Sequence, residues 1–232
     1  MLDVAIRKAD GSTAVDWQHV GVRTAPPLPV APALASLLPG GLRRGSTVSV
    51  SGSVSLLLAL LGAASADGAW CALVGFPRIS AEAALEYGVD LGRLALVPAP
   101  GEGWTTAVGA LLDAVDIVAA RPPRGRGPAS SVGLAPADVR RLAARARSKD
   151  AVLVPYVTSS AWPGADVRLH ARDGAWAGIG DGTGRLRARQ MEVTVGGRGP
   201  AARPATATLW LPADGGGVEQ SAPLAPVIDL AG

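Results

Sequence analysis

Apolar segments of strand type alternate with helical segments between residues 47 and 157, and this alternation constrains the fold more than any other feature. The strand-like segments are Thr47–Ser51, Trp70–Phe76, Leu94–Pro98, Asp116–Ala120 and Ala151–Val157. The helical segments between them are Leu56–Ala66, Ile79–Tyr87, Trp104–Val115 and Pro136–Lys149. Regular alternation of this kind predicts a parallel sheet with right-handed crossovers and helices on both faces.

The character of the sequence changes after Val157. Four further β-segments are joined by Gly-rich turns: Val167–His170, Trp176–Gly180, Leu186–Val195 and Thr206–Leu211. The run Asp181–Gly184 (DGTG) is a strong hairpin signal. We therefore expect an α/β fold whose mainly parallel sheet is extended by antiparallel strands toward the C-terminus.

The chain of 232 residues has the size of one α/β domain with an extension at each end. Residues 1–30 are expected to form an N-terminal arm, because the stretch Ala25–Pro32 (APPLPVAP) favours an extended conformation. Residues 31–212 are expected to form the core domain. Residues 213–232 are rich in Gly, Pro and Ala and are expected to form a flexible tail.

Cys71 is the single cysteine, which excludes an internal disulfide and a cysteine-cluster metal site. Its place in the middle of an apolar strand predicts a buried, inert thiol. The charged N-terminus does not resemble a signal peptide, and no apolar run reaches the ~20 residues of a membrane span. The expected location is the cytoplasm, where association with the nucleoid is an alternative, and no membrane contact is expected.

The turn after the first strand is where an α/β protein would hold a phosphate group. A working phosphate-binding loop reads G-x-x-x-x-G-K-[ST], in which backbone N–H groups and the lysine surround the phosphates. Here the positions are Gly52, Ser53, Val54 and Ser55, followed by leucines, so the second glycine and the lysine are both missing. Ser53 and Ser55 are interpreted as the N-cap and first turn of a helix.

The acidic residue that would hold Mg²⁺ is also missing from the fourth strand. That strand ends at Ala119 and Ala120, whereas Asp116 stands at its start, the opposite end. His19 and His170 are the only histidines, and neither has a motif neighbour. We therefore expect no enzymatic activity, no catalytic residues, no cofactor and no metal.

Positive charge is concentrated in residues 121–203, where 15 Arg and Lys stand against 6 Asp and Glu, a net charge of +9. Such a region can face DNA or an acidic partner, although a solvated surface is the simpler interpretation. The candidate contacts are Arg121, Arg124, Arg126, Arg185, Arg187 and Arg189. Trp162 and Trp176 fall near loops of this region and are candidate interface anchors.

Several segments resemble the RecA core. Leu37–Gly45 (LLPGGLRRG) resembles the approach to its first strand, Cys71–Val74 its second strand, and Tyr87–Leu94 (YGVDLGRL) the stretch before its third strand. The resemblance covers roughly residues 30–211, and it implies a RecA-like fold. The sequence departs from RecA at the phosphate-binding turn, around Pro122–Ser131 and after Val157, which argues against filament formation and strand exchange.

Among RecA-like proteins without a phosphate-binding loop, the chain resembles the actinobacterial ImuA-prime family. That resemblance implies a non-catalytic adaptor of the DNA-damage-induced mutasome, which performs translesion synthesis. The implied partners are an ImuB-like Y-family polymerase homologue and, indirectly, an error-prone DNA polymerase III alpha-type subunit. Val227, Ile228 and Leu230 form an apolar cluster expected to contact a partner. Two alternatives are a SulA-like division inhibitor and a RecA-like DNA-binding protein without ATPase activity.

Overall fold

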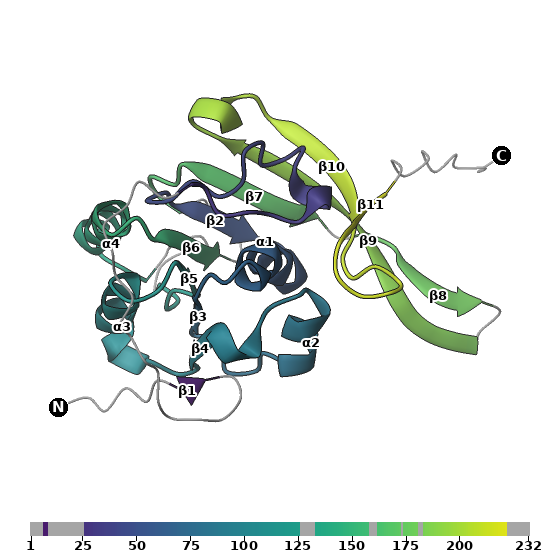
Figure 1. Cartoon of the computed structure of the whole chain (residues 1–232), viewed down its shortest axis with the longest axis horizontal. Coiled ribbons are helices and arrows are strands. Elements are labelled where there is room, and N and C mark those ends of the chain that lie inside the picture. The colour runs from purple at the N-terminus through teal and green to yellow at the C-terminus, as the bar shows by residue number, and fades with distance from the viewer. Residues whose placement is uncertain are drawn as a thin grey trace.

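The described residues form one 11-stranded sheet, whose order is β1-β4-β3-β5-β6-β2-β7-β9-β10-β11, with β8 paired to β9 (Figure 1). This computed structural model describes residues 7–8, 26–125, 133–157, 162–172, 174–180 and 183–221. None of the helices among these residues is long and apolar enough to cross a membrane.

The predicted alternation of strands and helices is confirmed for residues 48–157. The strands are β2 (Val48–Ser51), β3 (Cys71–Val74), β4 (Leu94–Val97), β5 (Ile117–Ala120) and β6 (Val152–Val157). The helices are α1 (Val54–Ala66), α2 (Ala81–Glu86), α3 (Trp104–Leu112) and α4 (Pro136–Ser148). All five strands run parallel, so their carboxyl ends meet at one edge of the sheet.

The two sides of the sheet carry separate apolar cores. Cys71 and Leu73 face the core that holds α1 and α2, whereas Ala72 and Val74 face the core that holds α3 and α4. This division follows from the alternation of side chains along a strand. Because both faces are covered, β3 is apolar throughout, as the sequence predicted.

The later strands extend the sheet beyond β2, and one of them differs from expectation. β7 (Val167–Arg172) runs parallel to β2, although the segments after Val157 were expected to be antiparallel. The N–H groups of Asp166 and Val167 donate to the carbonyl of Thr47, so β7 starts at the same edge as β2. The antiparallel strands are β8 (Trp176–Gly180), β9 (Thr183–Gly197), β10 (Ala205–Trp210) and β11 (Glu219–Gln220).

The ends of the described chain are tied into this sheet. The two-residue strand β1 (Arg7–Lys8) pairs with β4 at one edge, and β11 pairs with β10 at the other. β11 falls within the region expected to be a tail, and Ala213 before it is buried. The described structure therefore continues past residue 212 to Ser221, while Val227, Ile228 and Leu230 lie outside the described residues.

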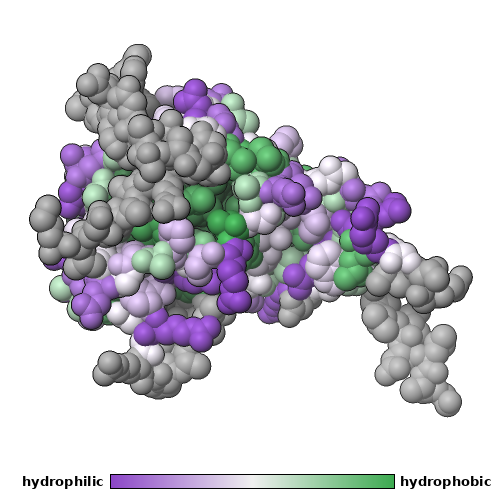
Figure 2. Space-filling view, turned by 90° about the horizontal axis from the view of Figure 1, so that it is seen from below, coloured by the Kyte–Doolittle hydropathy of each residue, from purple (hydrophilic) through white to green (hydrophobic). Residues whose placement is uncertain are grey.

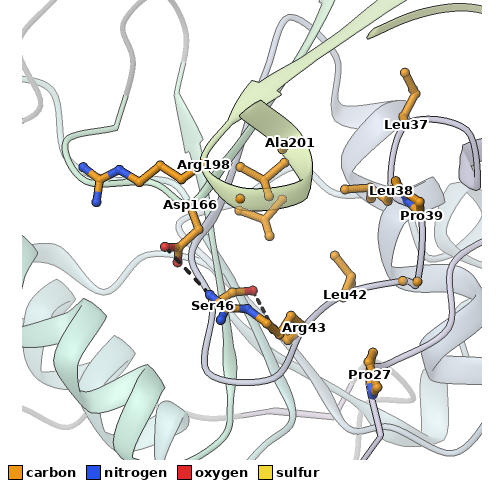
Figure 3. Close-up of a pocket in the computed structure, with 15 residues that line it drawn as sticks. Pro27, Leu37, Leu38, Pro39, Leu42, Arg43, Ser46, Asp166, Arg198 and Ala201 are labelled. Atoms are coloured by element: carbon orange, nitrogen blue, oxygen red, sulfur yellow. Dashed lines mark hydrogen bonds and ion pairs between the residues drawn. The ribbon is translucent and has the colours of Figure 1, made fainter. Parts of the chain in front are cut away.

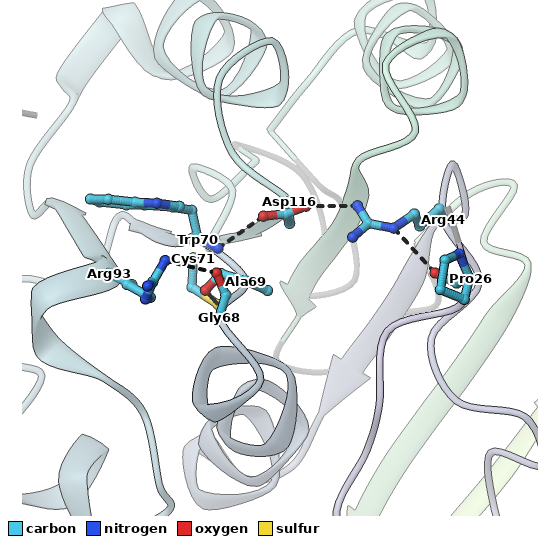
Figure 4. Close-up of polar contacts among 8 residues, drawn as sticks. All are labelled: Pro26, Arg44, Gly68, Ala69, Trp70, Cys71, Arg93 and Asp116. Carbon is cyan, nitrogen blue, oxygen red and sulfur yellow. Dashed lines mark hydrogen bonds and ion pairs between the residues drawn. The ribbon is translucent and has the colours of Figure 1, made fainter. Parts of the chain in front are cut away.

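Asp116 fixes the amino edge of the parallel sheet (Figure 4). One carboxylate oxygen accepts a hydrogen bond from Arg44 at 2.7 Å, and the other accepts from the backbone N–H of Trp70 at 2.9 Å. Arg44 also donates to the carbonyl of Pro26 at 3.2 Å. Asp116 thus joins β3, β5 and the segment before β2, a structural role at the edge opposite to the one where Mg²⁺ would be held.

Candidate functional site

The turn between β2 and α1 consists of two residues, Gly52 and Ser53. The helix begins at Val54, and the Ser53 hydroxyl accepts a hydrogen bond from the Leu56 N–H at 3.3 Å. Ser53 is therefore the N-cap and Ser55 lies in the first turn, as interpreted from the sequence. A turn this short directs no ring of N–H groups at a phosphate.

The backbone of β7 lies against this turn. Gly52 has a φ of +85°, and a Cβ built on it would overlap the carbonyl oxygen of Ala171. Just before the turn, the Ser51 hydroxyl lies 2.9 Å from Nδ1 of His170 and 3.3 Å from the carbonyl oxygen of Leu169. His170 thus has a partner in the neighbouring strand β2, and the backbone of β7 occupies the position beside Gly52.

Arg121 follows β5 at the carboxyl edge of the sheet. Its guanidinium carbon lies 4.8 Å from the ring centroid of Phe76 and 5.0 Å from that of Tyr156, which are cation–π distances. Burial raises the pKa of Tyr156, and the positive charge of Arg121 partly offsets this shift. The two rings fix a partly exposed cation at this edge, where it can contact a phosphate or a carboxylate. Arg124 is exposed nearby in sequence, and Arg126 lies outside the described residues.

The other three candidate arginines lie on a two-stranded ribbon, which is formed by β8 and the first half of β9 and extends from the body (Figure 1). Arg185 and Arg187 are exposed, and Arg189 lies 5.4 Å from the ring centroid of Trp176. Trp176 is 47% exposed. In the view from below, hydrophilic residues are spread around the rim of the visible face, including the end where Figure 1 places this ribbon (Figure 2).

The structure brings the two arginine groups to one side of the sheet without joining them. β7 ends at Arg172, opposite Glu192 of β9, and the part of β9 before Glu192 extends beyond that end. The ribbon therefore projects from the carboxyl edge of the sheet, where Arg121 also lies. Four strand spacings separate β5 from β9 in the sheet order, about 19 Å. An extended ligand can therefore reach both groups, whereas a small molecule cannot.

The burial of Trp162 and of Cys71 decides the predictions made for these two residues. The proposal that Trp162 anchors an interface is wrong, because this side chain is 1% exposed and packs in the core of α3 and α4. Cys71 is buried as predicted. Burial raises the pKa of its thiol to about 12, and the nearby Asp116 carboxylate adds to the shift, so the thiol stays protonated at neutral pH.

The described residues contain no cluster of three or more His, Cys, Asp or Glu that could hold a metal ion.

Sequence reasoning missed a pocket at the opposite, amino edge of β2 (Figure 3). It has a volume of about 540 Å³ and is lined by Leu38, Leu42, Val48 and Ala201, among others. In the sequence, the segment Leu37–Gly45 shows only a resemblance to RecA. The pocket's other wall is formed by residues 166–201, so no local pattern could have revealed it.

Comparison with known proteins places the chain in a family. A family model described as the MT3502 N-terminal domain matches residues 36–164, more than half of the chain. The chain belongs to the MT3502 N-terminal domain family. The matched residues contain the β2–α1 turn and Arg121 but neither the ribbon nor β10, so these features lie beyond the family domain.

Two further similarities accompany the MT3502 match. The chain is 37% identical over 139 residues to the uncharacterized protein Rv3395c of Mycobacterium tuberculosis (strain ATCC 25618 / H37Rv). That alignment covers 59% of this chain and 64% of the relative, less than two thirds of its length. The crystal structure of the RadB recombinase superposes with a TM-score of 0.60 at 14% identity, covering 82% of this chain and 97% of RadB. The fold is therefore RecA-like.

The close contact at Gly52 gives a prediction about stability. Gly52→Ala should lower the free energy of unfolding by more than about 3 kcal/mol, because the added methyl overlaps Ala171 and the backbone conformation is strained for Ala. Gly40→Ala is the matched control, since Gly40 has a φ of +86° but nothing within 4 Å of its Cβ position. It should cost only about 1 kcal/mol. Urea unfolding followed by circular dichroism measures both, and equal losses would contradict the packing described here.

Proposed function

We propose that the chain is a non-catalytic accessory protein of DNA-damage-induced translesion synthesis, resembling ImuA-prime. The observation that carries the proposal is the turn at Gly52, which has no lysine and is packed against Ala171. A buried triphosphate without a cationic partner would be strongly disfavoured. The RecA-like scaffold then acts through its surfaces, and the mycobacterial relative is consistent with an actinobacterial family of this kind.

The proposed partner is an ImuB-like Y-family polymerase homologue, with the error-prone DNA polymerase III alpha-type subunit bound indirectly. The proposed contacts are Val227, Ile228 and Leu230, whose apolar side chains suit a groove or sheet edge on a partner. The SulA-like alternative stays a prediction, and no contact among the described residues favours it over the adaptor.

Affinity capture from DNA-damaged cells tests the adaptor. The tagged full chain should co-purify with the ImuB-like protein, and the double variant Ile228→Asp, Leu230→Asp should recover at least tenfold less, because charged groups cannot enter an apolar groove without a partner. Leu224→Asp, outside the cluster, is the control and should recover the wild-type amount. Absence of the ImuB-like protein from the wild-type capture would reject the adaptor, and undiminished recovery by the double variant would remove the cluster from it.

A second candidate function is binding of single-stranded DNA by the ribbon. The observation that favours it is the exposed Trp176 on the same ribbon as the exposed arginines at 185 and 187, since an aromatic platform with cations nearby suits stacked bases and phosphates. Arg121, on the same side of the sheet, offers a further contact for an extended strand.

The salt dependence of the affinity for single-stranded DNA tests whether the ribbon is the binding site. Removing two phosphate contacts with Arg185→Gln and Arg187→Gln should reduce the slope of log K against log salt by about 1.4 for a single strand. The control is Arg140→Gln with Arg147→Gln, which removes the same charge from exposed positions on α4. Fluorescence anisotropy with a labelled oligonucleotide gives the slopes. Equal slopes for the two variants would show that only net charge matters, and the ribbon would not be the site.

A further inference from the structure

The pocket at the amino edge of β2 combines apolar walls with a positively charged rim (Figure 3). Arg43 stands on the rim with its side chain 73% exposed, and its contact with Asp166 is a distant 4.0 Å. Asp166 is held by another contact, because it accepts the Thr47 N–H at 2.9 Å. Arg198 on the far side of the pocket is exposed. These features suit an apolar peptide that carries an acidic residue.

The direction of β11 brings the end of the described chain toward this pocket. β11 runs antiparallel to β10, and the next residue, Ser221, donates its N–H to the carbonyl of Thr208 at 2.8 Å. β11 therefore points along β10 toward Ala205, the start of that strand. The short helix η4 (Gly199–Ala202) precedes β10, and its residue Ala201 lines the pocket. β11 also lies beside η1 (Pro32–Leu34), which leads into the other wall at Leu37.

The length of chain after Ser221 is sufficient to reach the pocket. Thr208 and Ala205 are three residues apart in a strand, about 10 Å. Val227 is six residues beyond Ser221, so an extended segment spans about 20 Å before the apolar cluster begins.

We propose that residues 227–230 (VIDL) dock into this pocket of their own chain. In an extended segment, Ile228 and Leu230 point to one side and Asp229 to the other. Ile228 and Leu230 contact the apolar walls, and Asp229 lies at the rim beside Arg43. The contact is made within the chain, so it does not depend on the mutasome proposal. A partner protein that binds residues 227–230 must compete with the pocket for them.

Disulfide trapping in the full chain tests the docking. Arg43→Cys and Asp229→Cys are introduced together, and the buried Cys71 thiol stays out of the exchange. Docking raises the effective concentration of the two thiols, so an intramolecular disulfide should form at least about tenfold faster than in a control pair. The control pair is Arg78→Cys with Asp229→Cys, because Arg78 is exposed after β3 at the carboxyl edge.

Three outcomes decide the proposal. The proposal is supported if the disulfide between residues 43 and 229 forms faster than the one in the control pair, and if adding Ile228→Glu and Leu230→Glu slows it again. Equal rates for the two cysteine pairs overturn it. Covalent dimers in place of the intramolecular product also overturn it, since the pocket would then hold the segment of a second copy. All three readouts use the isolated protein, so they are separate from the capture of an ImuB-like partner.

Discussion

The pairing of β2 with β7 determines what the carboxyl edge of this protein can do. β7 runs parallel to β2 and brings the carbonyl of Ala171 against the position where a Cβ of Gly52 would stand. Because the turn has two residues, helix α1 begins at once, and the Ser53 side chain caps it by accepting the Leu56 N–H. At the place where other α/β proteins hold a phosphate-binding loop, this scaffold therefore has a two-residue turn packed against β7.

The remaining features are surfaces at the two edges of the sheet. Arg121 is held by two aromatic rings after β5, and the ribbon extends from the same side of the sheet about 19 Å away. The pocket lies at the opposite edge, beside the amino end of β2. An extended ligand at the carboxyl edge and the chain's own segment in the pocket would thus not compete for space.

Sequence patterns predicted the parts of the fold that depend on local order. The alternation up to Val157, the capping role of Ser53, the burial of Cys71 and the position of Asp116 at the amino edge all follow from residues close together in the chain. The direction of β7 was not predicted, because it depends on where the chain returns to the sheet after Val157. The burial of Trp162 was missed for a related reason, since its packing against α3 and α4 is a tertiary contact.

The candidate site was predicted less fully than the fold. The missing lysine and glycine were visible in the sequence, but the contact between Gly52 and Ala171 joins residues more than a hundred positions apart. The pocket could not be predicted for the same reason, because its walls come from residues 27–48 and 166–201, which are far apart in the sequence. The aromatic pair around Arg121 likewise joins the ends of β3 and β6, which only the sheet order brings together.

Equilibrium dialysis of the purified full chain against labelled ATP with magnesium tests the central claim, that the Gly52–Ser53 turn cannot hold a triphosphate. We predict no saturable binding at ATP concentrations up to about 1 mM, which corresponds to a binding free energy weaker than about −4 kcal/mol. Saturable, magnesium-dependent binding that unlabelled ATP displaces would contradict the account.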